Sequence, residues 1–140
     1  IDGVIIPDLP FRDYEESYKP IALKYDIRVI MLITPETSEA RVREIDAHTD
    51  GFIYLVSSAA TTGAQKDFDT RKQAYFKRIE DMNLRNPRMV GFGISNKQTF
   101  DAACAHSSGA IIGSRFVTLL NENKGDAEKA IRQLKEGMRG

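Results

Sequence analysis

The 140-residue sequence has no tryptophan, a single cysteine, two histidines and a formal net charge of zero. A lone cysteine, Cys104, cannot form an intrachain disulfide, so we expect a reducing compartment, the cytoplasm. The balanced charge lacks the basic excess of proteins that bind nucleic acid or membrane surfaces, so we predict neither partner. No apolar run approaches the roughly 20 residues of a transmembrane helix. His48 and His106 have no cysteine or carboxylate at ligand spacing, so no metal site is predicted.

Apolar runs alternate with helical patterns five times along the chain. Strands are predicted at residues 4–6, 27–33, 51–57, 88–93 and 109–114. Helices are predicted between them, at residues 14–25 with a break and a second start around Pro20, 39–47, 70–82, 96–104, 115–120 and 127–138. Strict alternation of this kind indicates parallel strands with right-handed crossovers, in an open sheet or a barrel. Because the chain begins directly on a strand without an initiator methionine, we expect a fragment of a longer protein.

Apolar spacing within these helices predicts which side chains are buried. The first helix carries a tyrosine-rich stripe, and the last carries a stripe of small and aliphatic residues. The expected inward residues are Tyr14, Tyr18, Ile21, Tyr25, Val42, Ile45, Tyr75, Ile79, Met82, Phe100, Ala103, Cys104, Ala127, Ala130, Ile131, Leu134 and Met138. On this interpretation Cys104 is a packing residue and not a nucleophile.

Glycine follows three consecutive predicted strands, in the turns Thr62-Gly63, Phe92-Gly93 and Gly113-Ser114. Any one of them is explained by the needs of a turn alone. In a barrel of parallel strands, however, all carboxyl ends lie on one face, where backbone N–H groups from the three turns converge on one anion. A short helix from Arg115 and a second one beginning at Ser95 or Asn96 add favourable N-terminal dipoles. The three turns together predict a phosphate site.

The carboxylates near the strand ends have a simpler explanation than catalysis. Asp8 precedes Leu9-Pro10, where an aspartate most often forms a turn, although it also follows a strand on the same face. Glu36 lies in a Pro-Glu-Thr-Ser turn and is expected to be solvated. We therefore predict no general acid or base from either residue.

Five segments, taken in order, closely resemble the alpha subunit of tryptophan synthase. They are Asp8-Leu9-Pro10, Tyr54-Leu55-Val56-Ser57, Thr61-Thr62-Gly63, Gly91-Phe92-Gly93-Ile94-Ser95 and Gly113-Ser114. The resemblance implies an α/β fold, a partial (β/α)8 TIM barrel of five consecutive βα units that correspond to strands four to eight. Residues 1–140 would then be the C-terminal portion of a single barrel domain whose N-terminal βα units are absent.

The resemblance also implies roles for individual residues. The family cleaves indole-3-glycerol phosphate to indole and glyceraldehyde 3-phosphate in a retro-aldol step of tryptophan biosynthesis. It has no cofactor in this subunit, and indole passes to a beta subunit that carries pyridoxal phosphate. By position, Gly63, Phe92, Gly93, Gly113 and Ser114 would bind the phosphate, Tyr54 and Thr62 the rest of the substrate, and Asp8 and Pro10 the beta subunit.

Two departures limit what the resemblance implies. Ser58 stands where many family members have an arginine, so closure of this loop is expected to differ. The family's catalytic glutamate and aspartate come from the second strand and the loop after it, which precede residue 1. No catalytic residue is therefore predicted in this chain, and the fragment is expected to be inactive alone.

Two other functions are compatible with the residues. One is another phosphate-binding barrel enzyme of aromatic or histidine biosynthesis, and the other is a half-barrel module that binds phosphate without catalysis. In either case, five excised strands leave two unpaired edges, at Val4-Ile5-Ile6 and Ile111-Ile112. Apolar edges pair with other chains, so we expect the fragment, if it is the whole molecule, either to self-associate or to be accompanied by the missing part of the barrel.

Overall fold

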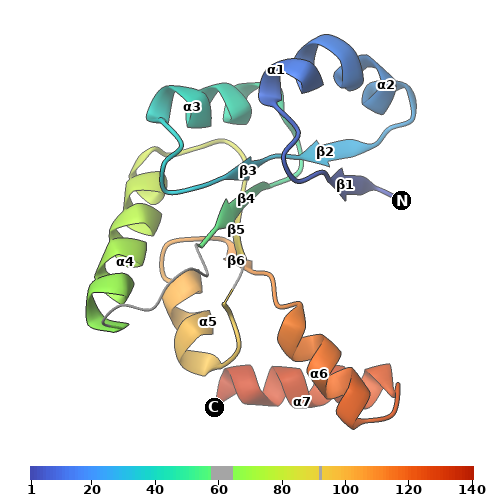
Figure 1. Ribbon diagram of the computed structural model, residues 1–140, viewed down its shortest axis with the longest axis vertical. Coiled ribbons are helices and arrows are strands. Elements are labelled where there is room, and N and C mark those ends of the chain that lie inside the picture. The colour runs from blue at the N-terminus through green and yellow to red at the C-terminus, as the bar shows by residue number, and fades with distance from the viewer. Residues whose placement is uncertain (58–64, 92) are drawn as a thin grey trace.

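The computed structural model describes the backbone of residues 1–57, 65–91 and 93–140, and their side chains except those of residues 65–69. Strands and helices alternate along the chain (Figure 1). The elements are β1 (Gly3–Ile5), α1 (Phe11–Asp13), the π-helical turn η1 (Tyr14–Tyr18), α2 (Lys19–Lys24), β2 (Arg28–Ile30), β3 (Leu32–Ile33), α3 (Glu39–His48), β4 (Ile53–Val56), α4 (Gln65–Asp81), β5 (Arg88–Gly91), α5 (Lys97–Cys104), β6 (Gly109–Ala110), α6 (Ser114–Glu122) and α7 (Ala127–Arg139).

Every strand pairing is parallel and joins neighbours in chain order. β1 pairs with β2, and β3, β4, β5 and β6 pair in sequence. β2 and β3 are two parts of the predicted strand 27–33, separated at Met31, whose carbonyl accepts a hydrogen bond from Tyr54 N at 3.0 Å. The helices lie on one side of this wall, from α1–α3 at the top of Figure 1 through α4 to α5–α7 at the bottom. Five βα units in this order form an arc of barrel wall.

The hydrophobic core lies between the helices and the face of the strands turned toward them, which is the outer face of the wall. Ile33, Ile53, Leu55 and Val90 are fully buried there. Their buried partners come from α1, η1, α3, α4 and the residue after it, and α5: Phe11, Tyr14, Val42, Ile45, Tyr75, Phe76, Ile79, Met82 and Ala103. Such continuous burial explains why these strands are uniformly apolar and do not alternate with polar residues.

Three helices begin with a side chain that caps their first N–H groups. Ser38 and Asp126 accept hydrogen bonds from Arg41 N and Lys129 N at the starts of α3 and α7. Asn96 caps α5 in a reciprocal capping box with Thr99. Each side chain satisfies an N–H group that the helix leaves without an internal partner.

The tyrosine stripe predicted on the first helix is wrong. Tyr14 is 5% exposed, but Tyr18, Ile21 and Tyr25 are 50%, 55% and 64% exposed. The cause is η1, because its i→i+5 bonding rotates later residues off the face that a 3.6-residue repeat would give. Pro20 lies in the first turn of α2, where its missing N–H is harmless, so the predicted second start is confirmed and follows a π-helical turn.

Both ends of the chain are less buried than the sequence predicts. In β1, Ile5 is 40% exposed, and β6 has only two residues, so Ser114 belongs to α6 and not to a strand. Each of these strands has a single neighbour, which leaves part of its surface uncovered. In α7, Ala130 is buried while Ala127 and Ile131 are exposed, because that helix packs mainly on α6 through a narrow strip. α4 also begins earlier than predicted, at Gln65 instead of Thr70.

Candidate functional site

The carboxyl ends of β4, β5 and β6 are joined by short hydrogen bonds. Ser57, which follows β4, donates to the carbonyl of Gly91 from its N–H at 3.1 Å and from its hydroxyl at 2.8 Å. Ile111, which follows β6, donates from its N–H to the carbonyl of Val90 at 2.7 Å. The strand ends that carry the predicted glycine turns are therefore neighbours. Of the residues predicted to bind substrate, Thr62, Gly63 and Phe92 lie outside the described residues, as does Ser58.

Tyr54 lies against Gly91 on the inner face of the wall, opposite the helices. A Cβ atom built on Gly91 would overlap the hydroxyl and ring of Tyr54, so glycine at this position lets Tyr54 keep its place. Tyr54 is 8% exposed, and burial raises the pKa of its phenol. Tyr54, which the sequence predicts to bind substrate, therefore presents a neutral hydroxyl group beside Gly91, the last residue of β5. Gly91 belongs to the motif, but this packing role cannot be seen in the sequence.

Gly93 follows β5 with φ +74°, a conformation that L side chains rarely adopt. The next N–H groups are already used by the cap of α5: Ser95 N and Asn96 N donate to Thr99 Oγ1 at 3.1 and 3.2 Å. Asn96 Oδ1 in turn accepts from Thr99 N at 2.9 Å. The N–H groups at the start of α5 are therefore less available to an anion than the sequence predicts. The phosphate contact expected here is then limited to the backbone around Gly93.

Gly113 and Ser114 are exposed at the start of α6. Gly113 has φ −99° and ψ −69°, which any residue adopts, and a Cβ there would meet no described atom within 4 Å. Among the described residues, no side chain caps this helix. Its first N–H groups and the Ser114 hydroxyl thus form an open, positively polarised end. Unlike Gly91 and Gly93, Gly113 is not required to be glycine by its φ or by any described atom, which is compatible with a backbone that a ligand approaches closely.

A hollow between α4 and α5 opens beside Gly93. It is lined by Ser57, Lys72, Gln73, Phe76, Gly93, Ile94, Thr99, Ala102 and Ala103. Gln73 ties the two helices by donating to the carbonyl of Ala102 at 3.4 Å. The sequence does not distinguish Lys72, because a lysine in a helical pattern is ordinarily a solvated surface residue.

Asp8 and Pro10 lie at the same end of the wall, after β1. Asp8 has a left-handed backbone (φ 61°), which aspartate tolerates in turns, and Pro10 precedes the first residue of α1. Both are exposed. The turn interpretation of Asp8 is confirmed, and the exposure of both residues leaves their predicted role at a subunit interface open.

A polar cluster that no sequence motif reveals lies at the opposite, amino end of β4 and β5. The Asp46 carboxylate, 9% exposed, accepts hydrogen bonds from Arg85 N at 2.7 Å and from Asn86 N at 2.8 Å. The Asn86 amide also donates to the carbonyls of Asp46 and Thr49. This cluster fixes the C-terminal end of α3 to the entry of β5. At this face of a barrel, such bonds stabilise the fold and do not contribute to chemistry.

The histidines and the cysteine have structural partners. His48 pairs with Glu15 at 2.9 Å, and His106 with Glu80 at 2.8 Å. Cys104 is partly buried, and burial, with Asp101 nearby, raises the pKa of its thiol. Within the described ranges no group of three or more His, Cys, Asp or Glu could hold a metal ion. No helix in that part of the chain is long and apolar enough to cross a membrane.

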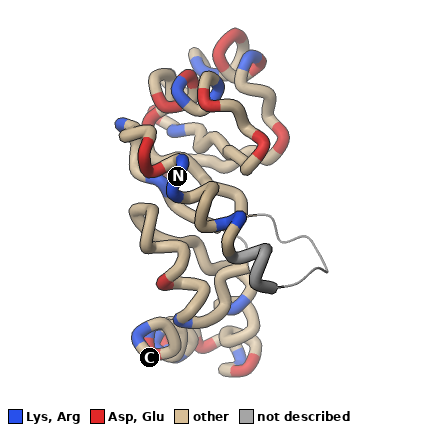
Figure 2. The backbone as a smooth tube through the Cα atoms, turned by 90° about the vertical axis from the view of Figure 1, so that its left-hand side faces the viewer, with Lys and Arg blue, Asp and Glu red and all other residues tan. Residues whose placement is uncertain are grey.

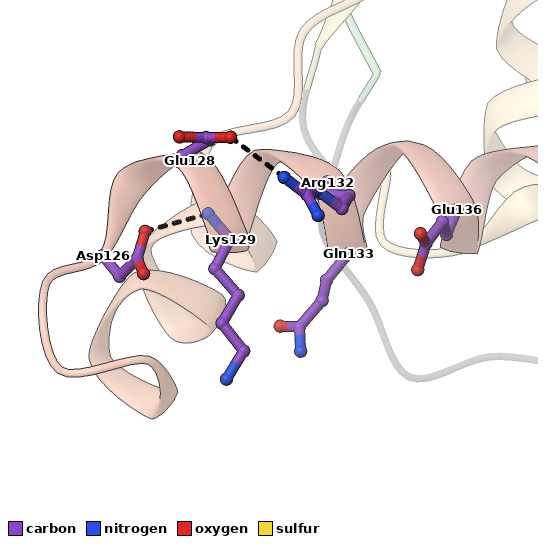
Figure 3. Close-up of a pocket in the computed structure, with 6 residues that line it drawn as sticks. All are labelled: Asp126, Glu128, Lys129, Arg132, Gln133 and Glu136. Atoms are coloured by element: carbon purple, nitrogen blue, oxygen red, sulfur yellow. Dashed lines mark hydrogen bonds and ion pairs between the residues drawn. The ribbon is translucent and has the colours of Figure 1, made fainter.

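The charged surface gives no second candidate. Lysine, arginine, aspartate and glutamate are interspersed along the chain (Figure 2). The hollow on α7 shown in Figure 3 is lined by Asp126, Glu128, Lys129, Arg132, Gln133 and Glu136. Within it Arg132 pairs with Glu128 at 2.9 Å, one helical turn away. Mixed charges paired along one helix are typical of a solvated face.

The sequence model of one protein family, described as "Tryptophan synthase alpha chain", matches residues 1–140, the whole chain. The chain belongs to the tryptophan synthase alpha chain family. A relative of that name from Bacteroides thetaiotaomicron is 77% identical over 139 residues, which are 99% of this chain and 54% of the relative. Another, from Flavobacterium psychrophilum, is 54% identical over 123 residues, 88% of this chain and 49% of the relative. The chain thus spans about half the length of these curated relatives.

Solved structures of the family share the fold. The alpha subunit from Campylobacter jejuni superposes with a TM-score of 0.76 at 30% identity, covering 98% of this chain and 54% of that one. The subunit from Pyrococcus furiosus gives a TM-score of 0.79 at 27% identity, covering 100% of this chain and 56% of that one. The predicted fold class is therefore confirmed: the chain is an α/β protein whose five βα units make up about half of a TIM barrel.

Proposed function

We propose that this chain supplies the phosphate-binding half of a tryptophan synthase alpha subunit. In this proposal residues 1–140 are one continuous part of a single barrel domain and correspond to its strands four to eight. The observation that carries the proposal is Gly113, a glycine that the described fold does not require, at the uncapped start of α6. It stands beside the strand end that leads to Gly93, as the bond from Ile111 N to the Val90 carbonyl shows.

The substrate we propose is indole-3-glycerol phosphate. Its phosphate accepts hydrogen bonds from backbone N–H groups at Gly63, Phe92, Gly93 and Gly113 and from the Ser114 side chain, and the partial positive charge at the start of α6 stabilises it. Tyr54, on the inner face, lies beneath the substrate. Thr62 would also contact the substrate.

The proposed reaction of the full-length protein is a retro-aldol cleavage. A general acid protonates the indole carbon, and the bond from that carbon to the glycerol carbon breaks. A general base removes the proton of the hydroxyl on that same glycerol carbon, which becomes the aldehyde carbon. The products are indole and glyceraldehyde 3-phosphate. We place both catalytic carboxylates in the other half of the barrel, so this chain binds and orients the phosphate end and is inactive alone.

The proposed partner is the tryptophan synthase beta subunit, which takes up the indole and carries the pyridoxal phosphate. A structure of a tryptophan synthase complex from Pyrococcus furiosus contains a chain that superposes on this one with a TM-score of 0.77 at 26% identity, covering 100% of this chain and 55% of that one. Asp8 and Pro10, exposed after β1, would contact the beta subunit.

Calorimetric titration of the chain with glycerol 3-phosphate tests the proposal. Two alanine variants form a matched pair, because a Cβ at Gly113 or at Gly137 meets no described atom within 4 Å. Gly113→Ala is expected to weaken binding about tenfold, since the new methyl group occupies the space that the phosphate approaches. Gly137→Ala, in α7, should leave affinity unchanged. Absence of binding by the wild-type chain, or equal affinities for all three proteins, would contradict the proposed site.

A further inference from the structure

Lys72 extends from the third turn of α4 toward the strand end that precedes α5. Its Nζ atom lies 3.9 Å from the position that a Cβ atom would occupy on Gly93. The side chain is partly buried and lines the same hollow as Ser57, Gly93 and Thr99. A side chain at position 93 would therefore point at the Lys72 ammonium group, and glycine leaves that space open.

We propose that Lys72 donates a charged hydrogen bond to the substrate phosphate, from the α4 side of the Gly93 turn. The inference rests on the proposed function and adds a full charge to a site otherwise built from neutral N–H and hydroxyl donors. A phosphate oxygen bound at the Gly93 backbone lies within a few ångströms of this ammonium group. Lysine is well suited to the task, because its flexible stem moves a compact point charge onto an anion.

The walls of the hollow strengthen the attraction between the Lys72 ammonium group and a phosphate. Phe76 and Ile94 provide apolar walls, and a charge pair is less screened beside such groups than in bulk water. Lys72, which lines this hollow from α4, is therefore positioned to contribute charge to the phosphate.

The experiment compares four forms of the chain: wild type, Lys72→Gln, Lys72→Arg and Arg71→Gln. Arg71 is the adjacent, exposed cation on α4, so Arg71→Gln controls for the loss of one charge from the helix. Affinity for glycerol 3-phosphate is measured by calorimetry at low and at high ionic strength. Urea midpoints confirm that each variant is folded.

Lys72→Gln is expected to bind about tenfold more weakly and to lose part of the salt dependence, because screening acts on the charge that was removed. Lys72→Arg should keep most of the wild-type affinity and most of its salt dependence. Arg71→Gln should equal the wild type in affinity and in salt dependence. Equal affinity and equal salt dependence of Lys72→Gln and wild type would overturn the role of Lys72 and leave the proposed function standing. No binding by the wild type would overturn both.

A second test follows the resonances of the wild-type chain during the titration and requires no variant. During the titration, the Lys72 Cε resonance should shift with the same saturation curve as the Gly93 amide. An unmoved Lys72 signal alongside a saturating Gly93 signal would contradict direct contact, whatever the stability of the variants.

Discussion

A methyl group added at Gly91 overlaps the Tyr54 hydroxyl, one added at Gly93 forces a left-handed backbone on an L residue, and one added at Gly113 meets no described atom within 4 Å. The three glycines therefore have three physical explanations: packing, conformation and, in our proposal, ligand access. Substitution separates them, because only the first two affect folding.

Gly91→Ala is expected to destabilise the chain by about 1–3 kcal/mol, the usual cost of forcing extra volume into a packed site. The new Cβ displaces the Tyr54 ring, which is 8% exposed. Urea denaturation measures the effect, with Gly113→Ala as the control expected to stay within about 0.5 kcal/mol of wild type. If the two alanine variants had equal midpoints, Tyr54 would not be fixed by Gly91.

The sequence predicts the glycine turns but not what each glycine does. Motif and spacing predict Gly93 and Gly113 at strand ends; Gly93 follows β5 closely, whereas Gly113 lies beyond the short β6, at the start of α6. The Thr99 hydroxyl, which occupies the N–H groups of Ser95 and Asn96, depends on the geometry of a capping box formed only in the folded helix. Lys72 reaches Gly93 from 21 positions away in the sequence, a contact that helical periodicity cannot indicate.

At the scale of elements, the Asp46 cluster joins α3 to the entry of β5. The carboxylate accepts from two backbone N–H groups and from the Asn86 amide. Asp46→Ala leaves these buried donors without a partner and is expected to cost about 3 kcal/mol. Asp50→Ala is the control, because its exposed pair with Arg85 should contribute less than about 1 kcal/mol. Thermal or urea unfolding measures the stability of both variants. Equal losses of stability would show that the Asp46 cluster does not hold α3 to the entry of β5.

Glu15 links η1 to the end of α3 through His48 and to α2 through Lys19. Burial alone would raise the pKa of its carboxyl, but the hydrogen bonds from Lys19 and His48 outweigh it and lower the pKa below the ordinary 4.5. A lowered folded-state pKa contributes stability that is present above the unfolded-state pKa and is lost as the pH falls through the folded-state value.

Glu15→Gln should therefore be less stable than the wild type near pH 7, by about 0.2–1 kcal/mol for pairs of this exposure. The difference should shrink as the pH falls below about 4.5 and the wild-type carboxyl is protonated. Urea unfolding of both proteins between pH 7 and pH 3 measures it. A difference that does not change with pH would rule out an ionic contribution from Glu15.

The order and type of the elements could be predicted, because buried parallel strands are apolar throughout and their helices carry cap residues such as Ser38 and Asp126. The π-helical turn could not, since nothing in Tyr14–Tyr18 distinguishes it from an ordinary helix. One such turn is enough to move Tyr18, Ile21 and Tyr25 from the predicted core to the surface.

At the scale of the whole molecule, the first strand, β1, lies at an open edge. A hollow at the β1 edge is lined by Asp2, Gly3, Val4, Ile5, Arg28, Ile30, Gly51 and Phe52. Ile5 and Ile6 are each 40% exposed beside it, and β1 pairs on one side with β2. An open strand edge with exposed aliphatic side chains is a template for pairing with another chain.

We propose that the isolated chain self-associates through this edge. Light scattering coupled to size exclusion should show a molecular mass that rises with concentration, and Ile5→Lys should lower it by placing a charge at the edge. Val117→Lys is the control, because Val117 is 53% exposed but lies on α6, away from β1. A monomer of constant mass at every concentration would contradict the proposal. An equal effect of the two lysine variants would instead assign the association to general surface hydrophobicity and not to the strand edge.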